Sequence, residues 1–360
     1  MVAEQIAKKD FENAIVNHRV TIEEALVHMG NEAAIVIDDD NRLCGIVTDG
    51  DIRRGFLAGA GMQTPVSEIM TISPIAAREK MPREEILSIM LKKQIRHLPV
   101  VDQENHPVGL ELLKNQYDES IGAAVLMAGG KGTRLSPITD STPKPLVRIG
   151  GNTILDNVLN GLKKSGVCDI AISVNYLGEQ IKNHVRDGKS YNLSISYLEE
   201  KKALGTAGAL SLMQPRPSKS FIVMNADLLT EIDYQALFRF HKKENNAFSV
   251  CVRTIRNTIP YGVVRLSGCQ STIEDVVEKP EHSYLVNAGI YLMEPQIIEL
   301  VPHNQFFDMV SLIKKAIASG FKVGAFPIYE YWRDIGQRDQ MEIAARELRD
   351  KQSAIEKTEE

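Results

Sequence analysis

A glycine-rich loop that directly follows an apolar segment constrains the fold of this chain more than any other feature. Residues 121–127, IGAAVLM, are predicted to form a buried strand. Three glycines lie within the next five residues, at Gly129, Gly130 and Gly132. Glycines let the backbone approach a ligand closely and point amide N–H groups at phosphate oxygens. With Lys131 and Arg134 adding positive charge, the sequence predicts a phosphate-binding loop at the end of a strand.

The two common phosphate-binding fingerprints are both missing from this loop. The pattern GxxxxGK[ST] does not occur, and GxGxxG fails because Leu135 stands at its third glycine position. Lys144 lies nearby between Pro143 and Pro145, whose rings restrict the backbone on either side. The loop therefore belongs to a different class of phosphate site.

Strand-like and helix-like segments alternate after this loop. Apolar runs at 169–174, 221–224 and 247–252 predict strands, and 153–166 predicts a helix that ends at Gly166. Such alternation favours an α/β fold in which helices cover a mostly parallel sheet. Ligands then bind beyond the carboxyl ends of the strands.

The first 118 residues contain an internal repeat. Segment 35–45, IVIDDDNRLCG, aligns without gaps to segment 99–109, PVVDQENHPVG, at an offset of 64 residues. An amphipathic helix is predicted ahead of each copy, at 21–29 and at 82–90. Each copy reads helix, strand, acidic turn, strand, so the two can bury their apolar faces against each other.

The domain limits predicted from these patterns are a repeat pair, a larger domain and a tail. The repeats span about 10–58 and 66–118 of an N-terminal domain at 1–118, which ends in a polar stretch near 115–121. The larger domain spans 119–346, and a polar C-terminal tail spans 347–360.

Composition excludes several classes of protein. The formal net charge of −5 leaves no basic excess for binding nucleic acid. The four cysteines, Cys44, Cys168, Cys251 and Cys269, have no CxxC spacing, so neither a zinc site nor a disulfide framework is predicted. No N-terminal apolar region suggests a signal peptide, and no apolar run approaches the ~20 residues that span a bilayer. We expect a soluble cytoplasmic protein with no membrane partner.

Residues 121 to about 345 resemble the sugar-1-phosphate nucleotidylyltransferases. The match begins with GGKGTRL and PKP and continues in the order of the family with LGTAGAL (204–210), NAD (225–227), EKP (278–280), NAGIY (287–291) and WRDIG (332–336). The resemblance implies a Rossmann-like, mostly parallel sheet of the GT-A-like nucleotidyltransferase type. It also implies an enzyme that transfers a nucleoside monophosphate to a sugar-1-phosphate and releases pyrophosphate.

The same resemblance implies roles for residues around the phosphates. Arg134 and Lys144 would stabilise the triphosphate and the transition state, as catalytic residues. The loop would wrap the nucleotide phosphates through Ala128, Gly129, Gly130, Gly132 and Thr133. Asp227 and Asp334 would bind Mg²⁺, a cation that prefers carboxylates, phosphate oxygens and water. Ala226 stands where the family usually has glycine, a small change from which we expect little disturbance.

Substrate-binding roles are implied in the same way. Lys279 would contact the sugar phosphate, and the sugar ring would be contacted by Glu278, Asn287 and Gly289. Small residues beside the base or ribose would be Gly205, Thr206 and Ala207.

The motifs LGTAGAL and YWRDIGQ are most similar to the guanylyltransferases of the family, which favours GTP and leaves UTP, CTP and dTTP open. A repeat pair ahead of such a domain is similar to the glucosamine-1-phosphate guanylyltransferases of bacterial legionaminic acid synthesis. That similarity favours glucosamine 1-phosphate, with mannose 1-phosphate as the alternative. A glycosyltransferase is disfavoured because Asp227 begins no DxD motif, and a catalytically inactive nucleotide-binding scaffold is the non-enzyme alternative.

The N-terminal repeats resemble a pair of CBS domains, an α+β module. GIVTDGDIRRG (45–55) and RHLPVVD (96–102) carry the resemblance. It implies a regulatory adenine or other nucleotide held by Thr48 and Asp51, whose counterparts in the second copy are Leu112 and Asn115. One of the two ligand sites is therefore expected to be lost. A structural or dimerising module without a ligand is the alternative, and in either case we expect a homo-oligomer.

Overall fold

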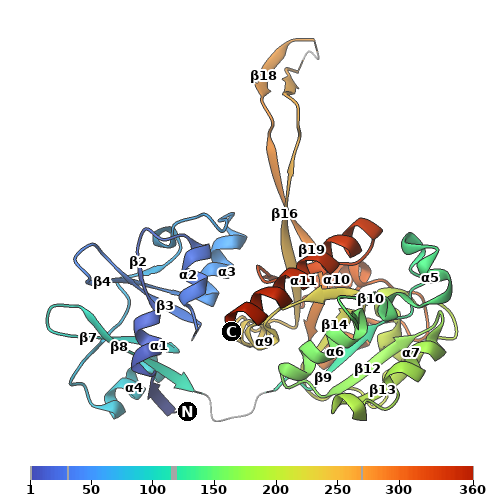
Figure 1. The fold of residues 1–360 in the computed structure, drawn as a ribbon, viewed down its shortest axis with the longest axis horizontal. Coiled ribbons are helices and arrows are strands. Elements are labelled where there is room, and N and C mark those ends of the chain that lie inside the picture. Colours follow the sequence, from blue (N-terminus) through green and yellow to red (C-terminus); the bar gives the residue numbers. More distant parts are fainter. Residues whose placement is uncertain (1, 31, 115–119, 269–270, 360) are drawn as a thin grey trace. The chain divides into compact units, whose positions relative to one another are not determined.

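The computed structural model describes residues 2–30, 32–114, 120–268 and 271–359, in two compact units formed by residues 1–119 and 120–360 (Figure 1). The polar stretch predicted as a boundary, Asn115 of the second repeat and Cys269 lie wholly or largely outside the described residues.

The N-terminal unit contains two four-stranded sheets and four helices among its described residues. One sheet has the order β2-β3-β4-β5, formed by Ile15–Asn17, Ala33–Ile37, Leu43–Thr48 and Thr71–Ile72. The other has the order β1-β8-β7-β6, formed by Val2–Gln5, Pro107–Lys114, His97–Val101 and Ala77–Arg78. The helices are α1 (Lys8–Asn13), α2 (Ile22–His28), α3 (Asp49–Leu57) and α4 (Arg83–Lys93).

The pairing pattern confirms the predicted repeat. In each sheet a parallel pair, β2 with β3 or β6 with β7, is followed by two antiparallel pairs. Both central hairpins contain a register shift, between Val36 and Ile37 and between Val100 and Val101, which are the positions related by the offset of 64. The fourth strand of the second sheet is β1, so the N-terminal segment completes the second copy.

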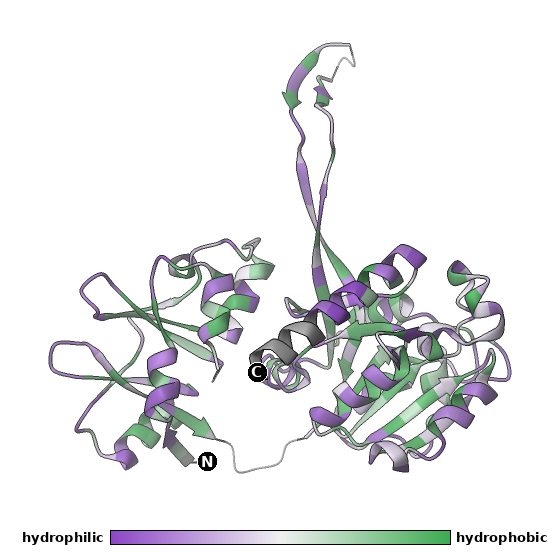
Figure 2. Cartoon of the chain, in the orientation of Figure 1, coloured by the Kyte–Doolittle hydropathy of each residue, from purple (hydrophilic) through white to green (hydrophobic). Residues whose placement is uncertain are grey.

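The larger unit is built on a seven-stranded sheet with the order β13-β12-β9-β14-β19-β16-β20. Its strands are β9 (Ala123–Met127), β12 (Asp169–Val174), β13 (Ser194–Glu199), β14 (Phe221–Asn225), β16 (Phe248–Thr258), β19 (Glu281–Met293) and β20 (Val323–Pro327). The sheet is mostly parallel, as predicted, because β19 alone runs antiparallel to its neighbours β14 and β16. Figure 2 shows that its strands are predominantly hydrophobic.

Helices cover the sheet and bury its apolar residues. They include α6 (Ile154–Lys164), α7 (Gly178–Val185), α8 (Gly205–Gly208), α9 (Tyr234–Lys243) and α10 (Met309–Ala318). Helix α6 begins with a capping box between Thr153 and Asp156 and ends before Gly166, whose φ of 81° suits a residue without Cβ, as predicted. It buries Leu155, Leu159 and Leu162 completely.

Asp156 also joins α6 to its neighbours. Burial alone would raise the pKa of this carboxyl group, but hydrogen bonds from Tyr191, Thr153 and His184 together lower it to about 2. The Tyr191 hydroxyl donates to Asp156 Oδ1 at 2.6 Å. A negative charge at this position therefore stabilises the fold.

The C-terminal segment differs from the predicted polar tail, because residues 338–359 form helix α11 (Arg338–Glu359). Ala344 of α11 is fully buried, and Leu348 packs against the same hydrophobic cluster. Glu347 accepts hydrogen bonds from Arg333 Nη2 at 2.6 Å and from the Tyr331 hydroxyl at 2.9 Å. These contacts with the preceding chain order a segment whose composition alone suggests fraying.

A long two-stranded ribbon extends from the sheet of the larger unit (Figure 1). The stem consists of β16 and β19, and the end consists of β17 (Val263–Leu266) and β18 (Ile273–Val277). The ribbon leaves the sheet at the carboxyl edge of β14, because β19 runs antiparallel to β14 and its early residues lie beyond Asn225.

Within the described residues, no helix is both long and apolar enough to cross a membrane.

Candidate active site

The glycine loop, a lysine and two aspartates meet at the carboxyl edge of the sheet. The loop follows β9, and Asp227 follows the adjacent strand β14. Asp334 lies on β21 (Trp332–Asp334), which pairs with β15 (Leu228–Thr230) so that Asp334 faces Leu228. Backbone N–H of Ile335 donates to Asp227 O at 3.3 Å, which links the two aspartate segments.

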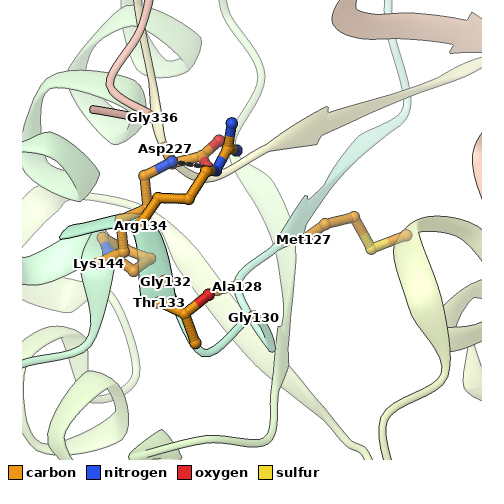
Figure 3. A pocket seen from close by; sticks show the side chains of 10 residues that line it. Met127, Ala128, Gly130, Gly132, Thr133, Arg134, Lys144, Asp227 and Gly336 are labelled. Atoms are coloured by element: carbon orange, nitrogen blue, oxygen red, sulfur yellow. Dashed lines mark hydrogen bonds and ion pairs between the residues drawn. The ribbon is translucent and has the colours of Figure 1, made fainter. Parts of the chain in front are cut away.

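A pocket of about 260 Å³ opens between these segments (Figure 3). Its lining residues are Met127, Ala128, Gly130, Gly132, Thr133, Arg134, Lys144, Pro145, Asp227 and Gly336. The structure thus brings six of the predicted phosphate-loop and catalytic residues together with one predicted metal ligand.

Gly132 fixes the path of the loop. Its φ of 64° lies in the left-handed region, and its carbonyl oxygen accepts a hydrogen bond from the Thr139 hydroxyl at 2.8 Å. A Cβ here would lie 3.0 Å from Thr139 Cγ2 and 3.2 Å from Lys144 Cβ. Only glycine satisfies both the backbone conformation and the close packing.

Gly129 does not line the pocket but packs against a carboxylate. A Cβ at Gly129 would lie 2.7 Å from Glu200 Oε1. Glu200 is buried, accepts a hydrogen bond from backbone N–H of Leu204 at 2.8 Å, and has its pKa raised by burial. No sequence pattern pointed to Glu200, which lies just ahead of the LGTAGAL motif.

Lys144 is the central cation of the site. Its side chain is only 8% exposed, and its Nζ donates to Asp227 Oδ2 and lies 3.5 Å from Asp334 Oδ1. Figure 3 shows the Lys144 and Asp227 side chains pointing toward each other. The buried ammonium lies between two carboxylates and offsets part of their negative charge, while the carboxylates stabilise the charged form of the lysine.

Each aspartate has one oxygen that accepts no hydrogen bond in the described part of the chain, although Asp334 Oδ1 is ion-paired with Lys144. Asp227 Oδ1 and Asp334 Oδ1 are buried and accept no hydrogen bond from any described residue. Two carboxylates with unsatisfied oxygens fit a hard divalent cation, which would also take phosphate oxygens and water. Among the described residues no group of three or more acidic, histidine or cysteine side chains forms a complete protein-only metal site.

Ala226 occupies the usual glycine position without distortion. It is fully buried, and its backbone N–H donates to Met127 O at 3.1 Å, which continues the pairing of β14 with β9. The expected small effect of this replacement agrees with the geometry.

Arg134 lies against Gly336, a residue for which no role was predicted. A Cβ at Gly336 would lie 3.4 Å from the guanidinium of Arg134, so Gly336 allows this cation to approach the backbone. Arg338 Nη2 donates to Ser136 O at 2.7 Å and ties the start of α11 to the loop. The WRDIG motif pointed to Gly336, but nothing local pointed to Arg338.

Three residues of the LGTAGAL motif make packing contacts and hydrogen bonds within the fold. Thr206 Oγ1 accepts from backbone N–H of Met309 at 2.8 Å, at the start of α10. Ala207 is fully buried, and Gly205 packs against the carbonyl of Phe307. None of the three lines the pocket, so their predicted contact with base or ribose stays a prediction.

The predicted sugar-binding residues separate into two groups. Gly289 packs against the Asn225 side chain, and its N–H donates to Asn287 Oδ1 at 2.9 Å, which places both beside the end of β14. Glu278 and Lys279 lie on the ribbon instead, exposed and outside the pocket lining. No sequence motif predicted this separation.

The predicted regulatory residues cap a helix in the N-terminal unit. Thr48 and Asp51 form the capping box of α3, and the Thr48 hydroxyl donates to Asp51 Oδ2 at 2.6 Å. Arg54 Nη2 donates to the other carboxylate oxygen at 2.6 Å. Their role in binding a nucleotide stays a prediction.

A mostly parallel sheet that gathers a glycine loop, cations and carboxylates at its carboxyl edge defines an α/β protein with a candidate ligand site at the position usual for this fold class. The family model for nucleotidyl transferase matches residues 123–351, and the CBS domain model matches residues 3–58 and 66–110. The chain belongs to the nucleotidyl transferase family and carries a CBS pair.

Curated relatives include guanylyltransferases that act on mannose 1-phosphate. The Arabidopsis thaliana mannose-1-phosphate guanylyltransferase 1 is 33% identical over 225 residues, which cover 59% of this chain and 61% of the relative. The Schizosaccharomyces pombe mannose-1-phosphate guanyltransferase is 32% identical over 221 residues, with the same coverage of 59% and 61%. The chain thus spans about three fifths of the length of these relatives.

A solved structure from Bacillus anthracis, assigned as a glucose-1-phosphate thymidylyltransferase in complex with sucrose, has the same fold. Its TM-score is 0.52 at 22% identity, and the match covers 63% of this chain and 95% of that one.

Proposed function

We propose that the chain transfers a nucleoside monophosphate from a nucleoside triphosphate to a hexose-1-phosphate and releases pyrophosphate. The observation that carries this proposal is the single pocket shared by the glycine loop, Arg134, Lys144 and Asp227. An oxygen of the sugar phosphate attacks the α-phosphorus, a new P–O bond forms, and the bond to the β-phosphate oxygen breaks. Several negative charges meet in this step, so the residues that neutralise and position them account for catalysis.

The residues of the chain have distinct tasks in this reaction. The loop backbone holds the triphosphate, and the Arg134 guanidinium places fixed positive charge beside it. Lys144 carries its ammonium in the same pocket and is able to neutralise charge that develops on the phosphates. Mg²⁺ bound by Asp227 and Asp334 would supply further charge neutralisation.

GTP is the nucleotide that we propose. Guanylyltransferases dominate the similar curated proteins described above, and the buried Glu200 carboxylate packs against the loop. A carboxylate accepts hydrogen bonds, and guanine offers its exocyclic amine as a donor, which uracil and thymine lack. Glucosamine 1-phosphate and mannose 1-phosphate both stay candidates for the sugar, with the relatives favouring the second.

The remaining proposals concern regulation and location. Nucleotide binding by the CBS pair, near Thr48 and Asp51, would couple a metabolite signal to the reaction. A cytoplasmic location agrees with substrates that are phosphorylated metabolites.

A pyrophosphate-release matrix tests the proposed function. Purified protein with Mg²⁺ is incubated with each of five nucleoside triphosphates against glucosamine, mannose and glucose 1-phosphates. We expect release with GTP and one of the hexosamine or hexose phosphates. Asp227→Asn should lower the rate by about 10²-fold or more, whereas the control Asp169→Asn should not, since Asp169 begins β12 at the opposite edge of the sheet. Nucleotide binding without release from any pair would favour the inactive scaffold instead.

A further inference from the structure

Helix α11, drawn in red in Figure 1, packs against two chain segments that supply charged residues to the site. Ala344 of this helix is fully buried in a hydrophobic cluster that also contains Val147 and Ile335. Val147 follows Lys144 by three residues, and Ile335 directly follows Asp334. The helix therefore connects, through one apolar cluster, the segment that carries the central lysine with the segment that carries one of the aspartates.

The strand that carries Asp334 uses its two faces differently. β21 is three residues long and pairs with another three-residue strand, β15, and so short a two-stranded sheet depends on packing against other elements. Side chains alternate along a strand, so Arg333 points to the opposite side from Trp332 and Asp334. Trp332 packs against the core cluster of the main sheet, and its Nε1 donates to Ala288 O at 2.9 Å. Asp334 is thus directed toward the site, whereas Arg333 reaches α11.

A carboxylate on α11 holds the Arg333 guanidinium from two directions. Nε and Nη2 of Arg333 donate to the two oxygens of Glu347 at 3.2 Å and 2.6 Å, and Nη1 donates to Gln340 Oε1 at 2.6 Å. The Tyr331 hydroxyl also donates to Glu347, at 2.9 Å. A bidentate pair of this kind fixes geometry as well as charge, and the Arg333 side chain is only 22% exposed. The residue directly before Asp334 is therefore held in place.

The Asp334 carboxylate itself has weak support. Its side chain is 45% exposed, and the Lys144 ammonium lies 3.5 Å from Oδ1, which accepts no hydrogen bond from any described residue. The position of this carboxylate therefore depends on the residues on either side of it. On one side, backbone N–H of Ile335 donates to Asp227 O at a long 3.3 Å. On the other side stands the pair of Arg333 with α11, which has shorter and more numerous contacts.

We propose that Glu347 is a positioning residue of the site, which acts through Arg333 to hold the Asp334 carboxylate where it can share a divalent cation with Asp227. This inference rests on the proposed function, in which the two aspartates bind Mg²⁺. Groups that hydrogen-bond and orient metal-binding side chains contribute strongly to metal affinity, and their loss typically weakens binding by about 10–100-fold. Glu347 is the first residue of the segment predicted as a polar tail, so composition gave it no role.

Titration of the full chain with Mn²⁺, followed by electron paramagnetic resonance of the free ion, tests this role without turnover. Glu347→Gln keeps the size of the side chain, removes its charge and should raise the dissociation constant for Mn²⁺ about tenfold. Arg333→Gln should have the same effect. Since both act through one contact, the double variant should bind Mn²⁺ no more weakly than either single variant. The matched control is Glu342→Gln, an exposed glutamate on the same helix, which should bind Mn²⁺ like the wild type.

A second variant separates loss of position from loss of stability. Ile297 is fully buried and follows β19 at the opposite edge of the sheet, so Ile297→Val removes one methylene group from a core cluster away from the site. This variant should melt at a lower temperature and keep the Mn²⁺ affinity of the wild type. In the pyrophosphate assay, Glu347→Gln should raise the Mg²⁺ concentration for half-maximal rate about tenfold and leave the KM for the sugar-1-phosphate unchanged.

Asp334→Asn distinguishes failure of this role from failure of the proposed metal site. Weaker Mn²⁺ binding in Asp334→Asn, with wild-type binding in Glu347→Gln, would overturn the positioning role alone. Wild-type affinity in Asp334→Asn, or a wild type that binds no Mn²⁺, would overturn the metal site and the positioning role together. A loss of affinity in Ile297→Val as large as that in Glu347→Gln would also overturn the positioning role, because reduced stability would then account for both.

Discussion

Lys144 holds two carboxylates that the proposed divalent ion would also bind, so removal of its charge should strengthen metal binding in the absence of nucleotide. Lys144→Met keeps most of the side-chain volume and removes the ammonium. Asp227 and Asp334 then carry uncompensated charge in a partly buried site. A divalent cation relieves that cost, so the variant should bind it more tightly than the wild type.

The magnitude follows from the geometry of the ion pair. At the 3.5 Å between Lys144 Nζ and Asp334 Oδ1, an effective dielectric constant of about 20 gives roughly 4–5 kcal/mol. The Asp334 side chain is 45% exposed, so solvent screening reduces this to about 2 kcal/mol. A difference of about 2 kcal/mol corresponds to roughly 30-fold in affinity.

Electron paramagnetic resonance of Mn²⁺ provides the assay, because it measures the free ion directly without turnover. Lys144→Met should lower the dissociation constant for Mn²⁺ by about 30-fold, and Lys144→Arg, which keeps the charge, should resemble the wild type. Adding Asp227→Asn to Lys144→Met should abolish the gain. Equal Mn²⁺ affinity in the wild type and Lys144→Met would refute the competition between lysine and metal.

Three further predictions concern the loop, the fold and the base. Gly132→Ala should cost about 1 kcal/mol or more of stability and lower pyrophosphate release, because its φ of 64° and the Cβ contact of 3.0 Å with Thr139 both oppose a side chain; urea unfolding followed by Trp332 fluorescence measures the stability. Asp156→Asn should cost about 1 kcal/mol at pH 7 after allowance for screening. The pKa of Asp156 is about 2 in the folded state and 3.8 ordinarily, so the loss of stability caused by Asp156→Asn should shrink as the pH falls through 4 toward 2. The free energies of unfolding of wild type and variant, measured at pH 7 and at pH 3, check this. Glu200→Gln should reduce the preference for GTP over UTP at least tenfold in kcat/KM, and an unchanged preference would remove Glu200 from base recognition.

The sequence predicted those parts of the fold that are encoded by local pattern. The offset of 64 residues located both copies of the N-terminal repeat, down to the equivalent register shifts at Val36 and Val100. The strand at 169–174 and the end of α6 before Gly166 also agree with the structure. In each case hydrophobic period and a helix-ending glycine act within a few residues, so no tertiary information is needed.

The site was predicted in part, because its motifs are local but their contacts are not. Spacing and family resemblance identified Lys144, Asp227 and Asp334, yet the ion pairs among them depend on β15 pairing with β21 across about a hundred residues of sequence. Glu200 was missed because a glutamate within the charged run 199–202, EEKK, has no recognisable pattern. Its burial against Gly129 is set by the packing of two separate strands.

The motif predicts that Lys279 contacts the sugar phosphate, but the structure places Lys279 on the ribbon, away from the pocket. One variant distinguishes the two interpretations. Glu281, two residues beyond Lys279, precedes Asn287 by six residues of β19, roughly 20 Å of extended strand. While the ribbon keeps this conformation, Lys279 is too far from Asn287 to share one hexose with it. Lys279→Ala should therefore leave nucleotide binding unchanged, whereas Arg134→Ala should weaken it. A selective rise in the KM for sugar-1-phosphate in Lys279→Ala would restore the motif-based role and require the ribbon to bend during turnover or to reach the site of another copy. An unchanged KM would show that Lys279 acts only in the ribbon.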